Sequence, residues 1–408
     1  MAASLIAHSR RLPTATVDLL KIAGDHGVLY SREGRGLAGQ GIALRVNRSD
    51  VERALGEIEC HGDLDHPGVG PIGFGALPFL PGASCEFIVP ELIVCVDDHG
   101  AWATTIRPAD QPPLEPVSAA QTAIEHFVRP APSDGPASFQ VEASRPPALW
   151  QQAVRSATER IRSGELDKVV LAREVVITAD TDISISTVLT RLSQQYPGCF
   201  LYLVSGFCGA SPELLVARSA DVVTAQPMAG TKPRRADREA DAQVVAELMS
   251  SATYRHEHQV TIDAVHDTLL DFCSYVDYEP EPSVVPLANV VHLATNVEGR
   301  LSHPPASILD LVSALHPTPA VCGRPRDVAL KVISELEELD RGPYAGAVGW
   351  VDRHGNGSFA VSIRGAEISD RTARVIAGNG MVADSDPPTE LIETRAKLQA
   401  MLSAIVRP

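Results

Sequence analysis

Two strand-like runs that return on themselves constrain the fold most strongly. Tyr344–Val351 and Phe359–Ile368 are rich in β-branched and aromatic residues, and they flank His354-Gly-Asn-Gly357. A short turn of Gly and Asn between two such runs predicts a β-hairpin, because these residues tolerate the positive φ of a tight turn. Hairpin strands with helical segments between them indicate an α+β fold rather than a doubly wound parallel sheet.

Proline divides the chain into two parts. Nine prolines lie between residues 107 and 147, interrupted by one short helical stretch at 119–128. We interpret this stretch as a connector, because proline interrupts both helices and strands. The 408 residues are too long for one small domain. We therefore expect an N-terminal lobe with the proline-rich connector, residues 1–147, packed onto the same fold as a main domain, residues 148–408.

Composition excludes several classes of partner. The 35 Lys and Arg against 51 Asp and Glu give a net charge of −16, and nucleic acid binding needs clustered positive charge. A small anionic substrate would need a local basic pocket. We see no membrane-spanning run and no signal peptide. The seven cysteines are scattered without a Cys-x-x-Cys, which favours buried free thiols in a reducing cytoplasm.

The sequence Gly68-Val-Gly-Pro-Ile-Gly73 matches the dinucleotide-binding pattern literally. That site needs a strand before the glycines and a helix that begins on them. Prolines at 71, 78 and 81 prevent such a helix. We therefore interpret this segment as turns between strands.

The last expected helix begins after Ser385-Asp386 and has Pro387 and Pro388 in its first turn. Glu390, Glu393 and Lys397 share one of its faces. Glu393 and Lys397 could form an ordinary surface ion pair, which contributes about 0.3–0.5 kcal/mol. A glycine-rich turn at 377–382 precedes the helix, and the N–H groups of such a turn suit an anion. Spacing alone leaves both interpretations open.

Glu257 lies between His256 and His258 on a segment, 237–272, that we expect to be largely helical. Residues two apart on a helix point roughly 200° apart, so the two histidines cannot bind one metal ion. Glu257 is either a lone ligand or a structural residue. A carboxylate from each of two helices would suit a hard cation such as Mg²⁺.

Lys168 opens the strand-like run 168–178, on the same face as Val170 and Ala172. A buried lysine is costly unless it is paired or functional, and such a lysine can serve as a general base. The alternative is a side chain that extends from the strand end to solvent. Glu213 ends the tight turn Gly209-Ala-Ser-Pro-Glu213. The nucleophile elbow G-x-S-x-G requires a glycine at this position, so Ser211 is an unsuitable nucleophile.

Ten segments in fixed order, spanning roughly residues 150–405, resemble the chorismate-utilising enzymes. They are Lys168-Val-Val-Leu-Ala-Arg173, Ser211-Pro-Glu-Leu-Leu215, Pro227-Met-Ala-Gly-Thr231, Arg255-His-Glu-His258, His292-Leu-Ala-Thr295, His316-Pro-Thr-Pro-Ala320, Arg341-Gly-Pro-Tyr-Ala-Gly346, Ser362-Ile-Arg364, Gly378-Asn-Gly380, and Ser385-Asp-Pro-Pro-Thr-Glu390 with Glu393 and Lys397. Each segment alone is weak, and the fixed order makes the resemblance specific.

Within this family the chain is most similar to isochorismate synthases. Anthranilate synthases carry Gln where this chain has Lys168, and salicylate synthases typically carry Thr where it has Ala320. The alternatives are a salicylate synthase, which also eliminates pyruvate, an anthranilate or aminodeoxychorismate synthase component, and a silent chorismate-binding scaffold. Tyr254 stands where many relatives have an acidic residue, and this difference bears on metal or substrate affinity. Asn379 and Met381 also depart, and we attribute both to packing.

The resemblance implies an aminodeoxychorismate synthase-like fold of two packed antiparallel β-sheets surrounded by helices. Residues 148–408 would be the chorismate-binding catalytic domain, with the site in the cleft between its halves. The implied reaction converts chorismate to isochorismate with Mg²⁺. Lys168 would activate water for attack on C2, and Glu213 would protonate the departing C4 hydroxyl.

The resemblance also implies the ligand contacts. Glu257 and Glu393 would hold Mg²⁺, with Glu390 acting through water. Tyr344, Arg364 and the Gly380 N–H would bind the side-chain carboxylate of chorismate. The rest of the pocket would be lined by Gly230, Thr231, His292, Ala320 and Lys397.

The expected partners are chorismate and Mg²⁺. We expect a cytoplasmic monomer that needs no glutaminase subunit, nucleic acid or membrane. The sequence leaves open whether menaquinone or siderophore and salicylate biosynthesis receives the product, and what the N-terminal lobe does.

Overall fold

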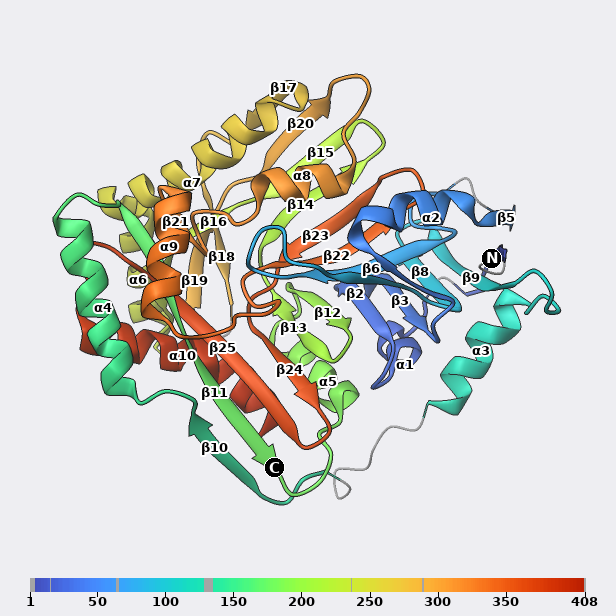
Figure 1. Cartoon of the computed structure of the whole chain (residues 1–408), viewed down its shortest axis with the longest axis horizontal. Coiled ribbons are helices and arrows are strands. Elements are labelled where there is room, and N and C mark those ends of the chain that lie inside the picture. The colour runs from blue at the N-terminus through green and yellow to red at the C-terminus, as the bar shows by residue number, and fades with distance from the viewer. Residues whose placement is uncertain are drawn as a thin grey trace.

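The computed structural model describes residues 4–14, 16–63, 66–127, 135–235, 237–287 and 290–406. Residues 128–134 of the expected connector lie outside this set. Figure 1 shows the helices around a body of strands, with the elements of the first 126 residues gathered on the right and α4, α9 and α10 on the left.

The first sheet contains thirteen strands among the described residues, in the order β10-β11-β25-β24-β13-β12-β2-β3-β8-β9-β1-β5, with β21 paired to β11 beside this path. The strands are β1 (Leu5–Arg11), β2 (Val28–Arg32), β3 (Arg35–Gln40), β5 (Glu59–Gly62), β8 (Leu92–Asp97), β9 (Gly100–Pro108), β10 (Phe139–Ala143), β11 (Lys168–Ala179), β12 (Phe200–Val204), β13 (Phe207–Ser211), β21 (Gly323–Arg324), β24 (Gly365–Ser369) and β25 (Thr372–Met381). β1 and β5 pair in parallel, and the other pairs of this sheet are antiparallel.

The second sheet has the order β17-β20-β15-β14-β23-β22-β6-β7-β4. Its strands are β4 (Leu44–Asn47), β6 (Ile72–Leu77), β7 (Glu86–Val89), β14 (Leu214–Ser219), β15 (Val222–Gln226), β17 (Cys273–Tyr278), β20 (Val297–Leu301), β22 (Ala347–Asp352) and β23 (Gly357–Val361). A third, small sheet has the order β16 (Met228–Pro233), β19 (Val290–Ala294), β18 (Ser283–Pro286).

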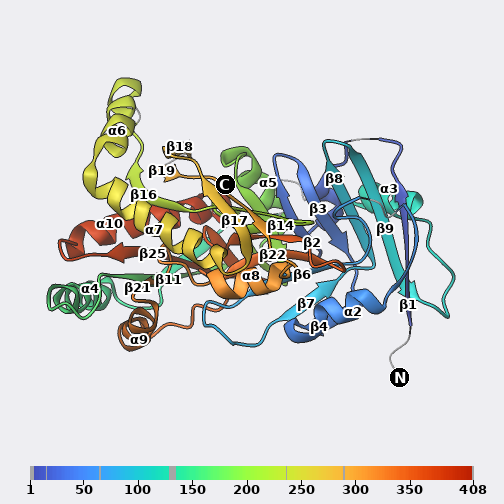
Figure 2. The same cartoon turned by 90° about the horizontal axis from the view of Figure 1, so that it is seen from above.

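Helices cover these sheets. They are α1 (Leu19–Ala23), α2 (Val51–Glu57), α3 (Pro116–His126), α4 (Pro147–Arg162), α5 (Ile185–Gln195), α6 (Arg238–Ser250), α7 (Ala252–Leu270), α8 (Ile308–Leu315), α9 (Arg326–Leu336) and α10 (Pro387–Ile405), with a short 3₁₀ helix, η1 (Arg48–Asp50). Figure 2 shows α6 and the small sheet on the side of the molecule opposite α4 and α9. The predicted α+β fold of packed antiparallel sheets surrounded by helices is confirmed.

Strands from the first 147 residues lie in both large sheets. β2 pairs with β12, where Tyr30 lies opposite Tyr202, and β6 pairs with β22, where Leu77 lies opposite Ala347. Apolar residues from both parts fill the space between the sheets, including the fully buried rings of Phe74, Phe87 and Phe359. A second large cluster also contains residues of both parts, so the two parts share their hydrophobic core.

The predicted hairpin is present as β22 and β23, joined by a turn in which Gly355 has a φ of 73°. One part of the prediction is wrong. The run Phe359–Ile368 is not one strand, because β23 ends at Val361 and β24 begins at Gly365 in the other sheet. Arg364 has a φ of 56° at this crossover. Arg364 is thus part-buried in the connection between the two large sheets.

The expected last helix is also confirmed as α10. The Asp386 side chain accepts a hydrogen bond from the Thr389 N–H, and Pro387 and Pro388 occupy the first turn. The expected helical segment 237–272 consists of two helices, α6 and α7. None of the helices in the described residues is long and apolar enough to cross a bilayer.

A buried ion pair supports the strand that begins at Lys168. The side chains of Glu337 and Arg341 are each only 2% exposed and are paired. Glu337 Oε1 accepts the Ala172 N–H at 2.6 Å, and Arg341 Nη2 donates to the Val170 carbonyl at 2.7 Å. The pair thereby satisfies two backbone groups of β11.

We predict that Glu337→Ala lowers the free energy of unfolding by about 3–5 kcal/mol, because it leaves the buried Arg341 guanidinium without a counter-charge. Glu335→Ala is the control, since its carboxylate is 40% exposed and pairs with Arg160 on the surface; it should cost at most about 1 kcal/mol. Urea unfolding of the two variants measures the difference. Equal losses would show that the buried pair gives β11 no special support.

Candidate active site

Lys168 lies at the start of β11, where it crosses a glycine of the neighbouring strand. β11 pairs with β25 from Val169–Met381 to Thr178–Thr372, and this register places Val170 opposite Gly380. A Cβ added to Gly380 would lie 2.5 Å from Lys168 Cε. Lys168 is 14% exposed at its side chain and donates from Nζ to Glu257 Oε1 at 2.7 Å. The lysine is therefore held inside the site and does not extend to solvent.

Glu257 reaches Lys168 from α7. The next residue, His258, is buried, and its Nε2 shares a hydrogen bond of 2.8 Å with Thr295 Oγ1. Burial lowers the pKa of His258 to about 4, so this contact is made by a neutral imidazole. The bond attaches α7 to the segment that follows β19. His256 is exposed, which agrees with the expectation that the two histidines point apart.

The face of α10 that carries Glu390, Glu393 and Lys397 lies against β25. Lys397 Nζ donates to the Asn379 side-chain oxygen at 2.6 Å and the Gly378 carbonyl at 3.2 Å, and pairs with Glu393 at 2.8 Å. Burial lowers the pKa of Lys397. The ion pair is thus not the solvated surface pair of the alternative interpretation, because the side chain of its lysine is only 12% exposed.

Asn379 also holds Glu390, so attributing this residue to packing alone was wrong. Its Nδ2 donates to Glu390 Oε2 at 3.0 Å, and Ser385 Oγ donates to Glu390 Oε1 at 2.7 Å. Burial raises the pKa of Glu390. In the sequence, Asn379 is a polar residue between two glycines, ahead of a helix with an acidic face. This pattern did not reveal which residues Asn379 would contact.

Glu213 is a buried carboxyl group between β13 and β14. It is 4% exposed, and its N–H donates to Ser211 Oγ at 3.3 Å. Burial raises its pKa to about 8, although a backbone N–H at Met228 and the charges of Lys168 and Arg364 act in the opposite direction. At neutral pH this carboxyl carries a proton that it can donate. Because the charges of Lys168 and Arg364 both act on the pKa of Glu213, the three groups lie in one region.

Arg364 supplies positive charge to the same region. Its left-handed backbone is unusual for a residue with a side chain and marks a position that the surrounding fold must enforce. Its charge lowers the pKa of His292 and opposes the rise in pKa that burial causes at Tyr344. Within the described residues, no carboxylate pairs with the Arg364 guanidinium. A bound anion could supply that counter-charge.

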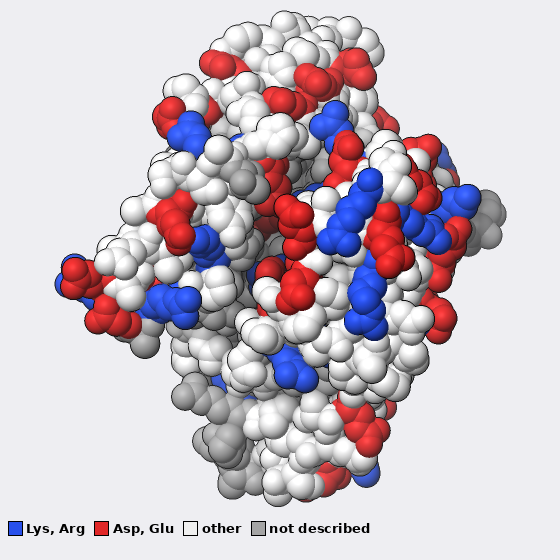
Figure 3. Space-filling model, turned by 90° about the vertical axis from the view of Figure 1, so that its left-hand side faces the viewer, with Lys and Arg blue, Asp and Glu red and all other residues white. Residues whose placement is uncertain are grey.

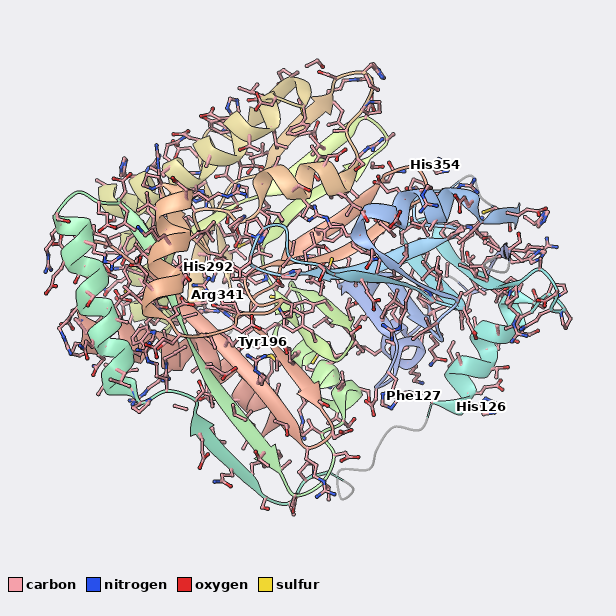
Figure 4. The ribbon with its side chains drawn as sticks, in the orientation of Figure 1. His126, Phe127, Tyr196, His292, Arg341 and His354 are labelled. Atoms are coloured by element: carbon pink, nitrogen blue, oxygen red, sulfur yellow. The ribbon has the colours of Figure 1, made fainter. Side chains whose placement is uncertain are left out.

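The small third sheet carries Gly230, Thr231 and His292. Gly230 has a φ of 78° at a bulge in the pairing of β16 with β19, where a residue with a side chain would be strained. Thr231 Oγ1 shares a hydrogen bond of 2.8 Å with His292 Nδ1. Burial, with the charges of Arg364 and Lys397, lowers the pKa of His292 to about 3. His292 Nε2 is buried without a partner, and Figure 4 shows this residue inside the molecule.

Ala320 and Tyr254 complete the sequence-predicted set. Ala320 is half-buried in the turn between α8 and β21. Tyr254 lies on α7, packs next to Gly230, and has the Lys232 ammonium 5.5 Å from its ring centre. It thus belongs to the contacts between α7 and the small sheet.

The carboxylates fit a hard divalent cation by their chemistry. Mg²⁺ is usually held by one or two protein carboxylates, several waters and substrate oxygens. Glu257 and Glu393 keep 35% and 37% of their side chains exposed, and each pairs with a lysine that lies against β25. The described residues include no group of three or more potential ligands already arranged around one point. Two glutamates with substrate and water would therefore have to suffice.

Figure 3 shows a hollow in the face of the molecule that lies at the left of Figure 1, with acidic and basic side chains around it. The structure brings together the buried Glu213 and His292 and the part-buried Lys168, Arg364 and Lys397, as their contacts and mutual charge effects indicate. These residues come from five separate parts of the chain.

Comparison with known proteins identifies the family. A model of the family described as "Chorismate binding enzyme" matches residues 42–406. The chain belongs to the chorismate-binding enzymes. It is 35% identical to the isochorismate synthase DhbC of Bacillus subtilis over 82% of this chain and 81% of that protein. It is 34% identical to the isochorismate synthase MenF of the same organism over 84% and 76% of the two chains.

Among solved structures, the chorismate-binding chain is similar to MenF, the menaquinone-specific isochorismate synthase of Escherichia coli. The TM-score is 0.80 at 25% identity, covering 98% of this chain and 95% of that one. This neighbour matches the first 147 residues as well as the remainder.

The raised pKa of Glu213 predicts a pH-dependent stability. The folded protein holds this proton up to about pH 8, whereas an unfolded glutamate releases it near 4.5. The stabilisation is therefore complete below pH 4.5 and is lost as the pH rises through 8. Relative to Glu213→Gln, we expect the wild-type free energy of unfolding to fall by up to about 5 kcal/mol across this range. Urea unfolding at several pH values measures it, and a pH-independent difference would contradict the assignment.

Proposed function

We propose that this protein is an isochorismate synthase that converts chorismate to isochorismate with Mg²⁺. The observation that supports this most strongly is the combination of a buried Glu213, protonated at neutral pH, with Lys168 in the same region. An acid and a base in different environments are what the isomerisation requires, since one hydroxyl leaves while another is added.

The proposed reaction balances its protons between these two residues. Lys168 Nζ takes a proton from water as the water oxygen forms a bond to C2. The ring double bonds shift, the C4–O bond breaks, and Glu213 gives its proton to the departing hydroxyl, which leaves as water. Exchange with solvent then removes the proton from Lys168 and returns one to Glu213.

Chorismate is a dianion, and the site offers separate contacts for its two carboxylates. Arg364, Tyr344 and the Gly380 N–H would bind the side-chain carboxylate, because a guanidinium fork and a hydroxyl match its two oxygens. Bound by Glu257 and Glu393, with Glu390 acting through water, Mg²⁺ would neutralise the ring carboxylate. Lys397, His292, Thr231, Gly230 and Ala320 would line the remaining surface.

The names of the similar proteins support isochorismate as the product and leave its destination open. MenF of Escherichia coli is named as menaquinone-specific, and a solved Bacillus anthracis relative is described as 2,3-dihydroxybenzoate-specific. We propose that the isochorismate made here enters menaquinone or siderophore and salicylate biosynthesis in the cytoplasm. We further propose that the enzyme works as a monomer without a glutaminase subunit.

We predict that chorismate and Mg²⁺ yield isochorismate with little salicylate or pyruvate, because Ala320 stands where salicylate synthases typically carry Thr. Liquid chromatography of the products and a coupled pyruvate assay measure both. Added ammonium should give no aminated product at neutral pH. Stoichiometric pyruvate would indicate a salicylate synthase, and an aminated product would show that the nucleophile is wrongly assigned.

Lys168→Ala and Glu213→Gln should each lower kcat by about 10²–10⁴-fold, the usual cost of removing an acid or base. Both variants should stay folded, and Glu213→Gln should still bind chorismate because an amide keeps the carboxyl's shape. Lys331→Ala, at an exposed position on α9, is the control and should keep full activity. Steady-state kinetics test this, and a near wild-type kcat in either variant would remove that residue from the mechanism.

Glu257→Gln and Glu393→Gln should each raise the Mg²⁺ requirement sharply, because an amide oxygen is a weaker ligand for a hard dication. EDTA should abolish activity and Mg²⁺ should restore it. Isothermal titration should show tighter Mg²⁺ binding with an unreactive chorismate analogue present, because the ring carboxylate of the ligand would interact with the metal ion. By linkage, Mg²⁺ should tighten binding of the analogue by the same factor. The exposed Glu159→Gln on α4 is the control. Full activity in EDTA, or equal Mg²⁺ affinity in both titrations, would refute the metal site.

A further inference from the structure

Phe79 belongs to the first 147 residues, yet it lies beside segments of the main domain that carry proposed site residues. It follows the end of β6 and is 1% exposed. A side chain at Gly346 would collide with the Leu77 carbonyl oxygen, so the chain leaves β6 directly against the loop that contains Tyr344. The position of Phe79 is thus fixed by strand pairing between the two parts of the chain.

The backbone of Phe79 joins two loops. Its N–H donates to the Gly342 carbonyl at 2.9 Å, two residues before Tyr344. Its carbonyl accepts from His316 Nε2 at 3.0 Å, at the start of the turn that carries Ala320. His316 is 6% exposed, and burial lowers its pKa to about 4. The neutral imidazole therefore carries a single N–H, and this N–H donates to the Phe79 carbonyl oxygen.

The ring of Phe79 supports the arginine behind the site. The Arg341 guanidinium carbon lies 4.0 Å from the ring centre, and Arg341 is 3% exposed. Arg341 donates from Nη1 to the Val321 carbonyl at 3.0 Å and from Nη2 to the Val170 carbonyl at 2.7 Å. Figure 4 shows Arg341 in the interior of the molecule. The ring thus contacts the group that connects the Ala320 turn to the Lys168 strand.

We propose that Phe79 is a positioning residue for the reaction, which sets the relative placement of the Lys168 strand, the Ala320 turn and the Tyr344 loop. This inference rests on the proposed function and gives the N-terminal part of the chain a role in catalysis. A guanidinium that is removed from water is attracted to the face of an aromatic ring, and an aliphatic side chain of similar size lacks that face. Small displacements of reacting groups lower kcat strongly.

The experiment compares Phe79→Leu with Phe87→Leu. Phe87 is equally buried and packs on Phe359, Gly73 and Gly75 within the second sheet, so its loss creates a similar defect away from Arg341. Both variants should lower the thermal unfolding midpoint by similar amounts. Phe79→Leu should lower kcat about tenfold with KM changed less than about threefold, and Phe87→Leu should leave kcat within about twofold of wild type.

An equal effect of the two substitutions on kcat would overturn the proposal. If Phe79→Leu does not fold, His316→Gln and His316→Leu decide the question. Gln keeps an N–H for the Phe79 carbonyl and should retain activity, whereas Leu should lose it, and equal kcat values would overturn the proposal. The wild type is assayed first. A folded wild type that makes no isochorismate refutes the proposed function and this role with it, whereas an active wild type isolates the role of Phe79.

Discussion

The passage of Lys168 over Gly380 is the constraint on which the site depends. The register of β11 and β25 sets these two residues close together, and only a glycine leaves room for the lysine side chain. Glu257 then holds Lys168 Nζ from α7, and Lys397 holds the same end of β25 from α10. One strand pair thereby fixes two helices, and with them the carboxylates proposed to bind the metal ion.

Charge in this region is largely balanced within it, although the net charge of the protein is −16. Lys168 and Lys397 are each paired with a glutamate, Arg364 has no carboxylate partner among the described residues, and burial keeps the Glu213 carboxyl protonated. Burying an ionised carboxylate without a partner would cost free energy, and the bound proton avoids this cost because it neutralises Glu213. The same burial that keeps Glu213 neutral supports the role proposed for it, the protonation of a departing hydroxyl. Arg364 is therefore the cation of this region that is left to attract a carboxylate of the substrate.

Local patterns predicted much of the fold and several of the residues that the structure brings together in the candidate site. The hairpin of β22 and β23, the α10 cap at Asp386 and the α+β class follow from short-range rules. Lys168 at the strand start and the glycine-rich turn at 377–382 were also recognised from the sequence. The contacts of Asn379 and Phe79 were not, because each depends on how separate elements pack, α10 against β25 and Arg341 against the segment after β6. Arg364 was placed in a continuous strand, since a change of sheet leaves no periodic pattern.

Infrared difference spectroscopy of the wild type against Glu213→Gln measures whether Glu213 is protonated at neutral pH. A protonated carboxyl absorbs at a frequency distinct from that of the ionised form. We expect a protonated carboxyl band in the wild type at pH 7 that is missing from the variant and disappears with a midpoint near pH 8. An ionised Glu213 at pH 6 would contradict it, because this residue could not then serve as the acid.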